Sequence, residues 1–238
     1  MNTPTPIIAF GDIHGSKLWK KVVSANPDCL YVFLGDYLDD YENIAPKTLI
    51  DNLLEIIEFK KLRPNDVVLL FGNHDLHYIT KKIDISTRYN RTYASTYQKN
   101  FTENLNLFQF AYQIDNYLFT HAGISQRWFE NDFKGNADKN IAEQLSNAAD
   151  EQTEALFRVG YARGGNRGDI GGIFWADSSE LEDPLQNFTQ IVGHNRVPEI
   201  QKIETEGGII WFCDALWQNQ YLKISNDLQK FEICKIKI

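Results

Sequence analysis

The sequence contains few cysteines, and they are not arranged in pairs. Its 238 residues include only Cys29, Cys213 and Cys234, without a CxxC motif. An odd number at wide spacing is typical of a reduced intracellular protein rather than of a disulfide framework. We therefore expect a cytoplasmic protein, in which Cys29 and Cys213 pack as free thiols within apolar strand-like segments.

Long hydrophobic runs are also absent. No segment approaches the roughly 18 apolar residues that a membrane span requires. Residues 1–12 have neither a basic start nor a long apolar stretch, so the sequence predicts no signal peptide. A membrane is therefore not an expected partner.

Positive charge is in short supply. The chain has 24 Lys and Arg against 32 Asp and Glu, which gives a formal net charge of −8. This balance disfavours bulk attraction to nucleic acid or to anionic lipid. It does not exclude a phosphorylated substrate, because two divalent cations would place about four positive charges in one cleft.

The remaining composition is that of an ordinary globular protein. Hydrophobic residues make up 43% of the chain and aromatic residues 13%, which argues against disorder. The sequence shows no internal repeat, low-complexity tract or clear linker. We therefore expect residues 1–238 to form a single domain.

The first third of the chain alternates short apolar runs with amphipathic segments. The apolar runs at 6–10, 29–34 and 66–71 read as buried strands, and 16–24 and 47–62 read as helices. Strand–helix–strand–helix–strand is the pattern of a parallel sheet with right-handed crossovers. It predicts an α/β fold.

The rest of the chain gives weaker local signals. We expect helical or loop material outside the sheet at 76–106, a hairpin from 108–112 and 116–120, and a polar surface excursion at 128–158. Residues 160–172 hold six of the fifteen glycines and must form a loop. Later strands are expected at 190–192, 209–212, 220–224 and 231–236, with the last three closing the fold as antiparallel strands.

Side chains that bind metals follow several of these strands. Four of the five histidines lie directly after apolar runs, together with two aspartates and an asparagine: Asp12, His14, Asp36, Asn73, His74, His121 and His194. The carboxyl ends of strands are where α/β sheets gather ligand sites. A mixture of imidazole and carboxylate ligands suits Mn, Fe or Zn. The pattern predicts a two-metal hydrolytic site, in which His74 offers a proton.

Five ordered motifs resemble those of a known family. They are GDIHG at 11–15, GDYLDDY at 35–41, GNHD at 72–75, THAG at 120–123 and GHN at 193–195. Their order is similar to that of the calcineurin-like metallophosphoesterases, phosphoprotein phosphatase branch, and GGIFWAD at 171–177 also resembles a segment of that branch. The resemblance implies a four-layer α-β-β-α sandwich with mixed sheets.

The resemblance also implies a role for each matching residue. Asp12, His14 and Asp36 would hold one metal ion. A second ion would share Asp36 and add Asn73, His121 and His194. A water bridging the ions would attack phosphorus, His74 would protonate the leaving oxygen, and Asp39 would orient His74 and keep it protonated.

The chain departs from the family pattern at one informative place. Asp40 stands where the branch has an arginine that binds substrate phosphate, and Tyr41 stands where it has a glycine. An aspartate cannot bind phosphate in the bidentate manner of arginine. Either Asp40 turns away, or another arginine binds the phosphate. The candidates are Arg163 and Arg167 in the glycine-rich loop, followed by Arg88 and Arg91.

Three functions compete on this basis. The first is a phosphomonoesterase that resembles serine/threonine phosphatases. The second keeps the same site but acts on nucleotides or dinucleoside polyphosphates. The third is a metal-binding scaffold without activity, although such modules usually lose ligands that this sequence retains.

Some polar residues near the motifs have simpler interpretations. Asp75 either caps the helix after His74 or supports the site, and His77 is interpreted as a supporting or surface residue rather than a ligand. Asp214 follows an apolar strand and could support the loop of the last histidine.

Overall fold

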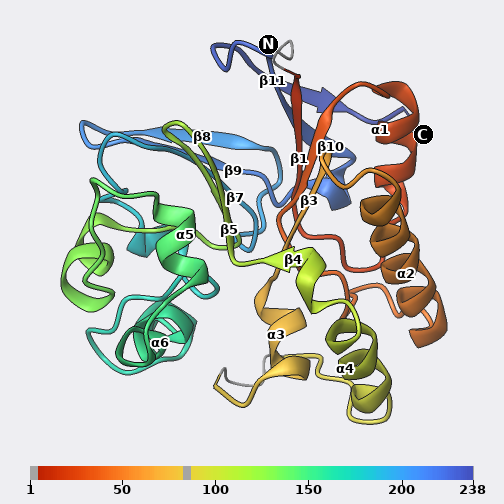
Figure 1. The fold of residues 1–238 in the computed structure, drawn as a ribbon, viewed down its shortest axis with the longest axis horizontal. Helices are drawn as coiled ribbons and strands as arrows, with labels where there is room; N and C mark the ends of the chain where they lie inside the picture. Colours follow the sequence, from red (N-terminus) through yellow and green to blue (C-terminus); the bar gives the residue numbers. More distant parts are fainter. Residues whose placement is uncertain (1–4, 83–86, 238) are drawn as a thin grey trace.

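The computed structural model describes residues 5–82 and 87–237. Its centre is a pair of β-sheets that lie against each other (Figure 1). The first sheet has six strands in the order β11-β10-β1-β2-β3-β4. Its strands are β1 (Ile7–Phe10), β2 (Leu30–Phe33), β3 (Val67–Leu70), β4 (Phe108–Gln109), β10 (Gln220–Ile224) and β11 (Phe231–Lys235). Strands β1 to β4 are parallel, and β10 and β11 are antiparallel.

The second sheet has five strands in the order β5-β6-β7-β9-β8. They are β5 (Ala111–Ile114), β6 (Tyr117–Thr120), β7 (Thr189–Val192), β8 (Gln201–Glu204) and β9 (Ile209–Phe212). The three central strands β6, β7 and β9 are parallel, and the edge strands β5 and β8 are antiparallel. Each sheet is therefore mixed and has a parallel centre.

Helices cover the outer faces of the two sheets (Figure 1). Helices α1 (Leu18–Ala25) and α2 (Pro46–Leu62) flank the first sheet, and α5 (Ile141–Ser146) packs against β5 of the second. The others are α3 (Asn73–Ile79), α4 (Ala94–Thr102) and α6 (Asp150–Phe157), with short 3₁₀ turns at 105–107, 161–163, 178–180 and 216–218 and a π turn at 128–132. The expected four-layer α-β-β-α sandwich is confirmed.

Alternation along β1 shows how the core divides. Ile7 and Ala9 belong to the cluster between the sheets, whereas Ile8 and Phe10 belong to the cluster under the helices. Successive side chains point to opposite faces of a strand. Because both faces are covered, the strand reads as a continuous apolar run.

The strands and helices expected in the first third are confirmed to within two residues. Two later expectations were wrong. Residues 108–112 do not form one strand, because β4 joins the first sheet and β5 pairs with β6 in the second. Strand β9 is parallel to β7 rather than antiparallel to all its neighbours.

The segment 128–158 is not a surface excursion. Trp128, Phe129 and Phe133 are buried, and so are Ile141 and Leu145. Their side chains belong to the same buried cluster as Leu118 of β6, in the second sheet. Polar residues lie between them in the sequence. Because the segment is polar on average, its composition did not indicate these buried residues.

Two smaller expectations concern cysteines and membranes. Cys29 and Cys213 are buried free thiols, as expected. Within residues 5–82 and 87–237, no helix combines the length and the apolar character that crossing a bilayer requires.

Candidate metal centre and active site

The candidate ligands follow the carboxyl ends of the parallel strands in both sheets. Asp12 and Asp36 follow β1 and β2, and Asn73 follows β3 after two residues. From the second sheet, His121 follows β6 directly and His194 follows β7. Parallel strands present their carboxyl ends at one edge of a sheet, so two facing sheets bring both sets of side chains together.

The first group of ligand atoms comes from loops after β1 and β2. Nε2 of His14 lies 3.8 Å from Oδ2 of Asp12 and 3.7 Å from Oδ2 of Asp36. Two ligand atoms on one tetrahedral ion, each at about 2.1 Å from it, lie about 3.4 Å apart. Asp12, His14 and Asp36 are therefore close to the spacing that one ion requires.

The second group shares Asp36 with the first. Oδ1 of Asn73 lies 2.9 Å from Nε2 of His121 and 3.1 Å from Nδ1 of His194. Nε2 of His121 is also 3.6 Å from Oδ2 of Asp36. One carboxylate oxygen, Oδ2 of Asp36, thus lies close to both groups, as expected for a ligand that bridges two ions.

Hydrogen bonds fix which atoms face the site. Nδ1 of His14 is 2.8 Å from the carbonyl oxygen of Leu38, and Nδ1 of His121 is 2.8 Å from that of Leu34. Each Nδ1–H can donate only if Nε2 carries the lone pair, so the tautomer assigned from these bonds presents Nε2 to a metal.

The two carboxylates are oriented in the same way. Oδ1 of Asp12 accepts the N–H of His194 at 2.9 Å, and Oδ1 of Asp36 accepts the N–H of His74 at 2.9 Å. In each case one oxygen is held by the backbone, which leaves Oδ2 facing the ligand groups. The second oxygen is thus available for a metal.

The electrostatics of the site fit bound cations. Burial, followed by the charge of Asp214, raises the pKa of Asp12; burial and then the charge of Asp12 raise the pKa of Asp36. Burial also lowers the pKa of His14 and of His121 to about 3, so both imidazoles are neutral at pH 7. Buried carboxylates beside neutral imidazoles form a donor set without a counter-charge, which divalent ions would supply.

One contact also indicates a cation. Nε2 of His121 and Oδ1 of Asn73 are both acceptors in the assigned forms, yet they are 2.9 Å apart. Two acceptors repel at this distance unless a cation lies between them. The residues therefore fit a metal that binds both.

The backbone of the site is strained. Four of its residues have left-handed backbone angles, with φ of +38° at His14, +52° at Asp36, +59° at Asp39 and +58° at His194. For residues other than glycine such angles cost on the order of 1–3 kcal/mol each and tend to cluster at functional sites. The surrounding fold holds the ligands in place against this cost.

Glycine permits the close approach of two ligand loops. A Cβ atom on Gly72 would collide with the carboxylate of Asp36, and one on Gly193 would collide with that of Asp12. The glycines in the GNHD and GHN motifs are therefore needed for the packing of the ligands themselves.

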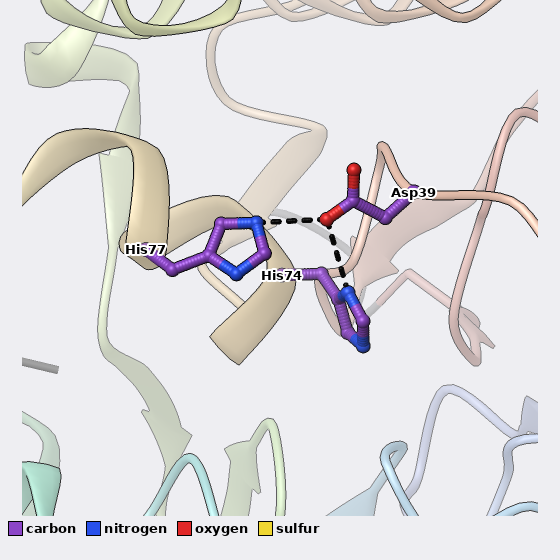
Figure 2. Close-up of side chains that lie close together, drawn as sticks. All are labelled: Asp39, His74 and His77. Carbon is purple, nitrogen blue, oxygen red and sulfur yellow. Dashed lines mark hydrogen bonds and ion pairs between the residues drawn. The ribbon is translucent and has the colours of Figure 1, made fainter. Parts of the chain in front are cut away.

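His74 lies beside this centre in contact with Asp39. Nδ1 of His74 is 3.1 Å from Oδ2 of Asp39, and Nε2 of His77 is 2.7 Å from the same oxygen (Figure 2). The hydroxyl of Tyr78 donates to Oδ1. Burial alone would raise the pKa of Asp39, but the hydrogen bonds from His74, His77 and Tyr78 lower it. Asp39 is thus a buried carboxylate at the back of His74.

His77 and Asp75 have clearer places than the sequence indicated. His77 is buried on helix α3, one turn after His74, and supports Asp39 rather than lying on the surface. The carboxylate of Asp75 accepts the N–H groups of Gly72, Asp36 and Tyr37, each at 2.9 Å. It therefore both caps α3 and ties the Asp36 loop to that helix.

Asn73 and His74 form the first turn of α3 and are not in a loop.

A cleft of about 930 Å³ opens onto the ligand groups. Of the four candidate arginines, Arg163 is among the described residues that line it, and Arg167, Arg88 and Arg91 are not. Arg167 and Arg91 are exposed. Asp40 accepts the N–H of Ile44 within its own loop and is not among the described residues that line the cleft.

Arg163 is held by two contacts at the wall of the cleft. Its Nε lies 2.8 Å from Oδ2 of Asp177, and its Nη2 donates to Oδ1 of Asn195 at 2.6 Å. Both partners belong to motifs identified in the sequence, GGIFWAD and GHN. The glycine-rich loop is thus anchored to the cleft through Arg163.

Of two further residues of the cleft, Asp214 was expected only to support the loop of the last histidine, and Arg196 was not identified from the sequence. Asp214 lies after β9, is buried, and accepts the N–H of Val197 through its carbonyl oxygen at 3.0 Å. Burial raises its pKa to about 6. Arg196 lines the same cleft. The available signals were the place of Asp214 after a strand and the position of Arg196 directly after the GHN motif.

Comparisons with known proteins agree with this geometry. The model of the calcineurin-like phosphoesterase family matches residues 5–194. A catalytic subunit of protein phosphatase 2A from Dictyostelium discoideum is 32% identical over 130 residues, which are 51% of this chain and 39% of that protein. The chain thus spans well under half of that relative.

Solved structures share the fold at low identity. A serine/threonine phosphatase from Saccharomyces cerevisiae has a TM-score of 0.56 and 17% identity, covering 100% of this chain and 81% of the other. A protein proposed to be a diadenosine tetraphosphatase has a TM-score of 0.54 and 14% identity, with coverage of 98% and 95%. The match of the family model over most of the chain is decisive: the chain belongs to the calcineurin-like phosphoesterase family.

Proposed function

We propose that the chain hydrolyses phosphomonoesters, in the manner of serine/threonine phosphatases, with two divalent metal ions. The observation that carries the proposal is the position of Asp36. Its Oδ2 lies within 3.7 Å of His14 and 3.6 Å of His121, so one carboxylate serves two ligand groups. A histidine backed by a buried carboxylate stands beside them in the same cleft.

Each ligand group suits one ion. Asp12, His14 and Asp36 would hold the first, and Asp36, Asn73, His121 and His194 the second. Mn, Fe and Zn all accept these ligands. When bound, such ions neutralise charge on phosphoryl oxygens and activate a water nucleophile at neutral pH.

The residues beside the ions would handle the leaving group. His74 lines the cleft and would donate a proton to the leaving oxygen of the phosphoester. Asp39 would hold the imidazole of His74 through its Nδ1, which directs Nε2 towards the substrate. Arg163 lines the same cleft and would also contact the substrate.

The test is release of phosphate from a phosphoserine peptide. The protein is stripped of metal, reloaded with Mn(II) and compared with His74→Asn. Loss of general acid catalysis should lower the rate by about 10²–10⁴. Two bound ions with no turnover of the phosphopeptide by the wild type would contradict the proposal and favour nucleotide phosphoesters as substrates, whereas failure to hold any divalent metal would favour the scaffold.

A second function is supported by two observations. The arginine expected at position 40 is replaced by Asp40, and a protein proposed to be a diadenosine tetraphosphatase shares the fold over 95% of its chain. The same site could therefore act on nucleotides or dinucleoside polyphosphates. Turnover of a dinucleoside tetraphosphate, measured beside that of the phosphopeptide, separates the two.

A further inference from the structure

Arg196 is an exposed residue that lines the cleft, and its guanidinium group contacts two aromatic rings. Its Cζ lies 4.0 Å from the ring centroid of Trp217 and 5.5 Å from that of Tyr41. All three residues line the cleft. Stacking uses the faces of the guanidinium group and leaves the N–H groups at its edge. The rings thus orient Arg196 without consuming its donors.

The two arginines of the cleft differ in charge balance. Arg163 already has a carboxylate partner, Asp177, at 2.8 Å. The guanidinium group of Arg196 contacts two rings, and the described part of the chain contains no ion pair of Arg196 within 4.0 Å and no side-chain hydrogen bond. Burial raises the pKa of Asp214 and the charge of Arg196 opposes this, but the hydrogen-bond donors of Arg196 remain available for an anionic ligand.

Tyr41 connects Arg196 to the candidate centre. Its ring lies edge to face with that of His14, with centroids 4.9 Å apart, and its centroid is 6.4 Å from that of His74. One aromatic ring therefore separates Arg196 from a metal ligand and from the proton donor. This is a suitable place for a group that contacts the phosphoryl oxygens or the leaving group.

The backbone around Arg196 is fixed to the site. On its N-terminal side, the N–H of His194 donates to Asp12 at 2.9 Å. On its C-terminal side, the N–H of Val197 donates to the carbonyl oxygen of Asp214 at 3.0 Å. Arg196 thus extends from a segment anchored at both sides to the residues beneath the cleft, and its position is coupled to that of the ligands.

We propose that Arg196, held between Tyr41 and Trp217, binds the phosphoryl group of the substrate and replaces the arginine that is missing at position 40. The loop that carries Asp40 contributes Tyr41 instead, whose ring contacts Arg88 at 4.3 Å and Arg196 at 5.5 Å. The inference rests on the proposed function, since it assigns a substrate contact to that site.

The experiment measures phosphate binding separately from turnover. Inorganic phosphate is titrated calorimetrically into the Mn(II)-loaded protein, for the wild type and for Arg196→Met, which removes the charge and keeps a long side chain. We expect Arg196→Met to weaken phosphate binding about 10- to 100-fold, the effect of losing charge-assisted hydrogen bonds. Phosphopeptide hydrolysis should show a higher KM, and the Mn(II) content should stay unchanged.

Matched variants locate the effect. Arg127→Met removes another exposed arginine, outside the residues that line the cleft, and should leave phosphate binding unchanged. Arg196→Lys keeps the charge without the planar group and should recover only part of the affinity. Trp217→Leu removes one stacking face and should weaken binding less than Arg196→Met.

Three results would overturn the inference. Phosphate binding unaffected by Arg196→Met is one, and loss of bound Mn(II) in that variant, which would reveal a structural role, is another. The third is a larger loss of phosphate binding in Arg163→Met than in Arg196→Met. Failure of the proposed function gives a different result. The wild type would then hydrolyse no phosphoester, even if Arg196→Met still weakened the binding of inorganic phosphate.

Discussion

A single oxygen of Asp39 faces two histidines, with Nε2 of His77 at 2.7 Å and Nδ1 of His74 at 3.1 Å. Both histidines lie on helix α3, three residues apart, and therefore project from the same side of the helix. His77 is the nearer of the two and is buried. We interpret it as the residue that positions Asp39, which in turn positions His74.

This arrangement predicts graded losses of activity. His74→Asn should lower the rate about 10²–10⁴-fold, since a general acid contributes that much. His77→Gln should cost about 10-fold, as a supporting residue does. Steady-state kinetics on phosphoserine peptide and on p-nitrophenyl phosphate provide the measurement. The His74→Asn loss should be much smaller for the nitrophenyl ester, whose leaving group needs no proton, and equal losses on both substrates would argue against a general acid.

The shared carboxylate predicts an unequal effect on metal content. Asp36 contacts both ligand groups, whereas His14 belongs to one and Asn73 to the other. Asp36→Asn should therefore lose both Mn(II) ions at concentrations that saturate the wild type. His14→Gln should retain one, as measured by equilibrium dialysis with elemental analysis. Retention of two ions by Asp36→Asn would exclude a bridging role.

The buried carboxyl groups predict how the metal-free protein responds to pH. Burial raises the pKa of Asp75 to about 7, and the pKa values of Asp12 and Asp36 also rise. A raised carboxyl pKa means that the folded state binds more protons than the unfolded state, so stability falls as pH rises towards the folded pKa. His14 and His121, with pKa values of about 3, and His194, whose pKa burial also lowers, have the opposite effect, which fades as the pH rises through the unfolded value of about 6.5.

Above about pH 6.5 the carboxyl effect is the larger one, because the histidine effect is lost as the unfolded histidines deprotonate. The melting temperature of the metal-stripped protein should therefore fall between pH 6.5 and 8, by about 2–4 °C for each kcal/mol lost. Mn(II) should remove most of this dependence, because bound ions stabilise the ionised carboxylates. Calorimetry at both pH values tests this. A stripped protein that is more stable at pH 8 would contradict the assignment of these groups as buried and uncompensated.

The sequence contained enough to place the candidate ligands but not their surroundings. Candidate ligands such as Asp12 and His121 lie within two residues of the end of an apolar strand, so their position is encoded locally. The contact between Arg196 and Tyr41 joins loops after β7 and β2, in different sheets, and no local pattern encodes it. The same holds for β8, whose four residues are all exposed and carry no apolar signal.

The buried face of 128–158 was missed for a related reason. Trp128, Phe129 and Phe133 are spaced irregularly around a π turn, so they do not follow the helical period. Periodicity detects a buried face only where the backbone is regular. The metal-site motifs could still be identified, because they are recognised by their residue types and not by a repeating hydrophobic pattern.

Gly72 allows the contact between β3 and the Asp36 loop to be tested directly. Its missing Cβ is where the Asp36 carboxylate lies, and its N–H donates to Asp75 at 2.9 Å. Gly72→Ala should push Asp36 away and lower both Mn(II) content and turnover more than tenfold. The matched control is Gly207→Ala, where a Cβ would meet its neighbours only at ordinary contact distances of 3.4 Å or more. The new Cβ would also lie 2.6 Å from the backbone nitrogen of Asp36. The melting temperature of metal-free Gly72→Ala is therefore compared with that of metal-free Asp36→Asn, to separate a loss of folding from a loss of metal binding. A folded Gly72→Ala protein that still binds two ions would show that the Asp36 loop can shift without losing its ligands.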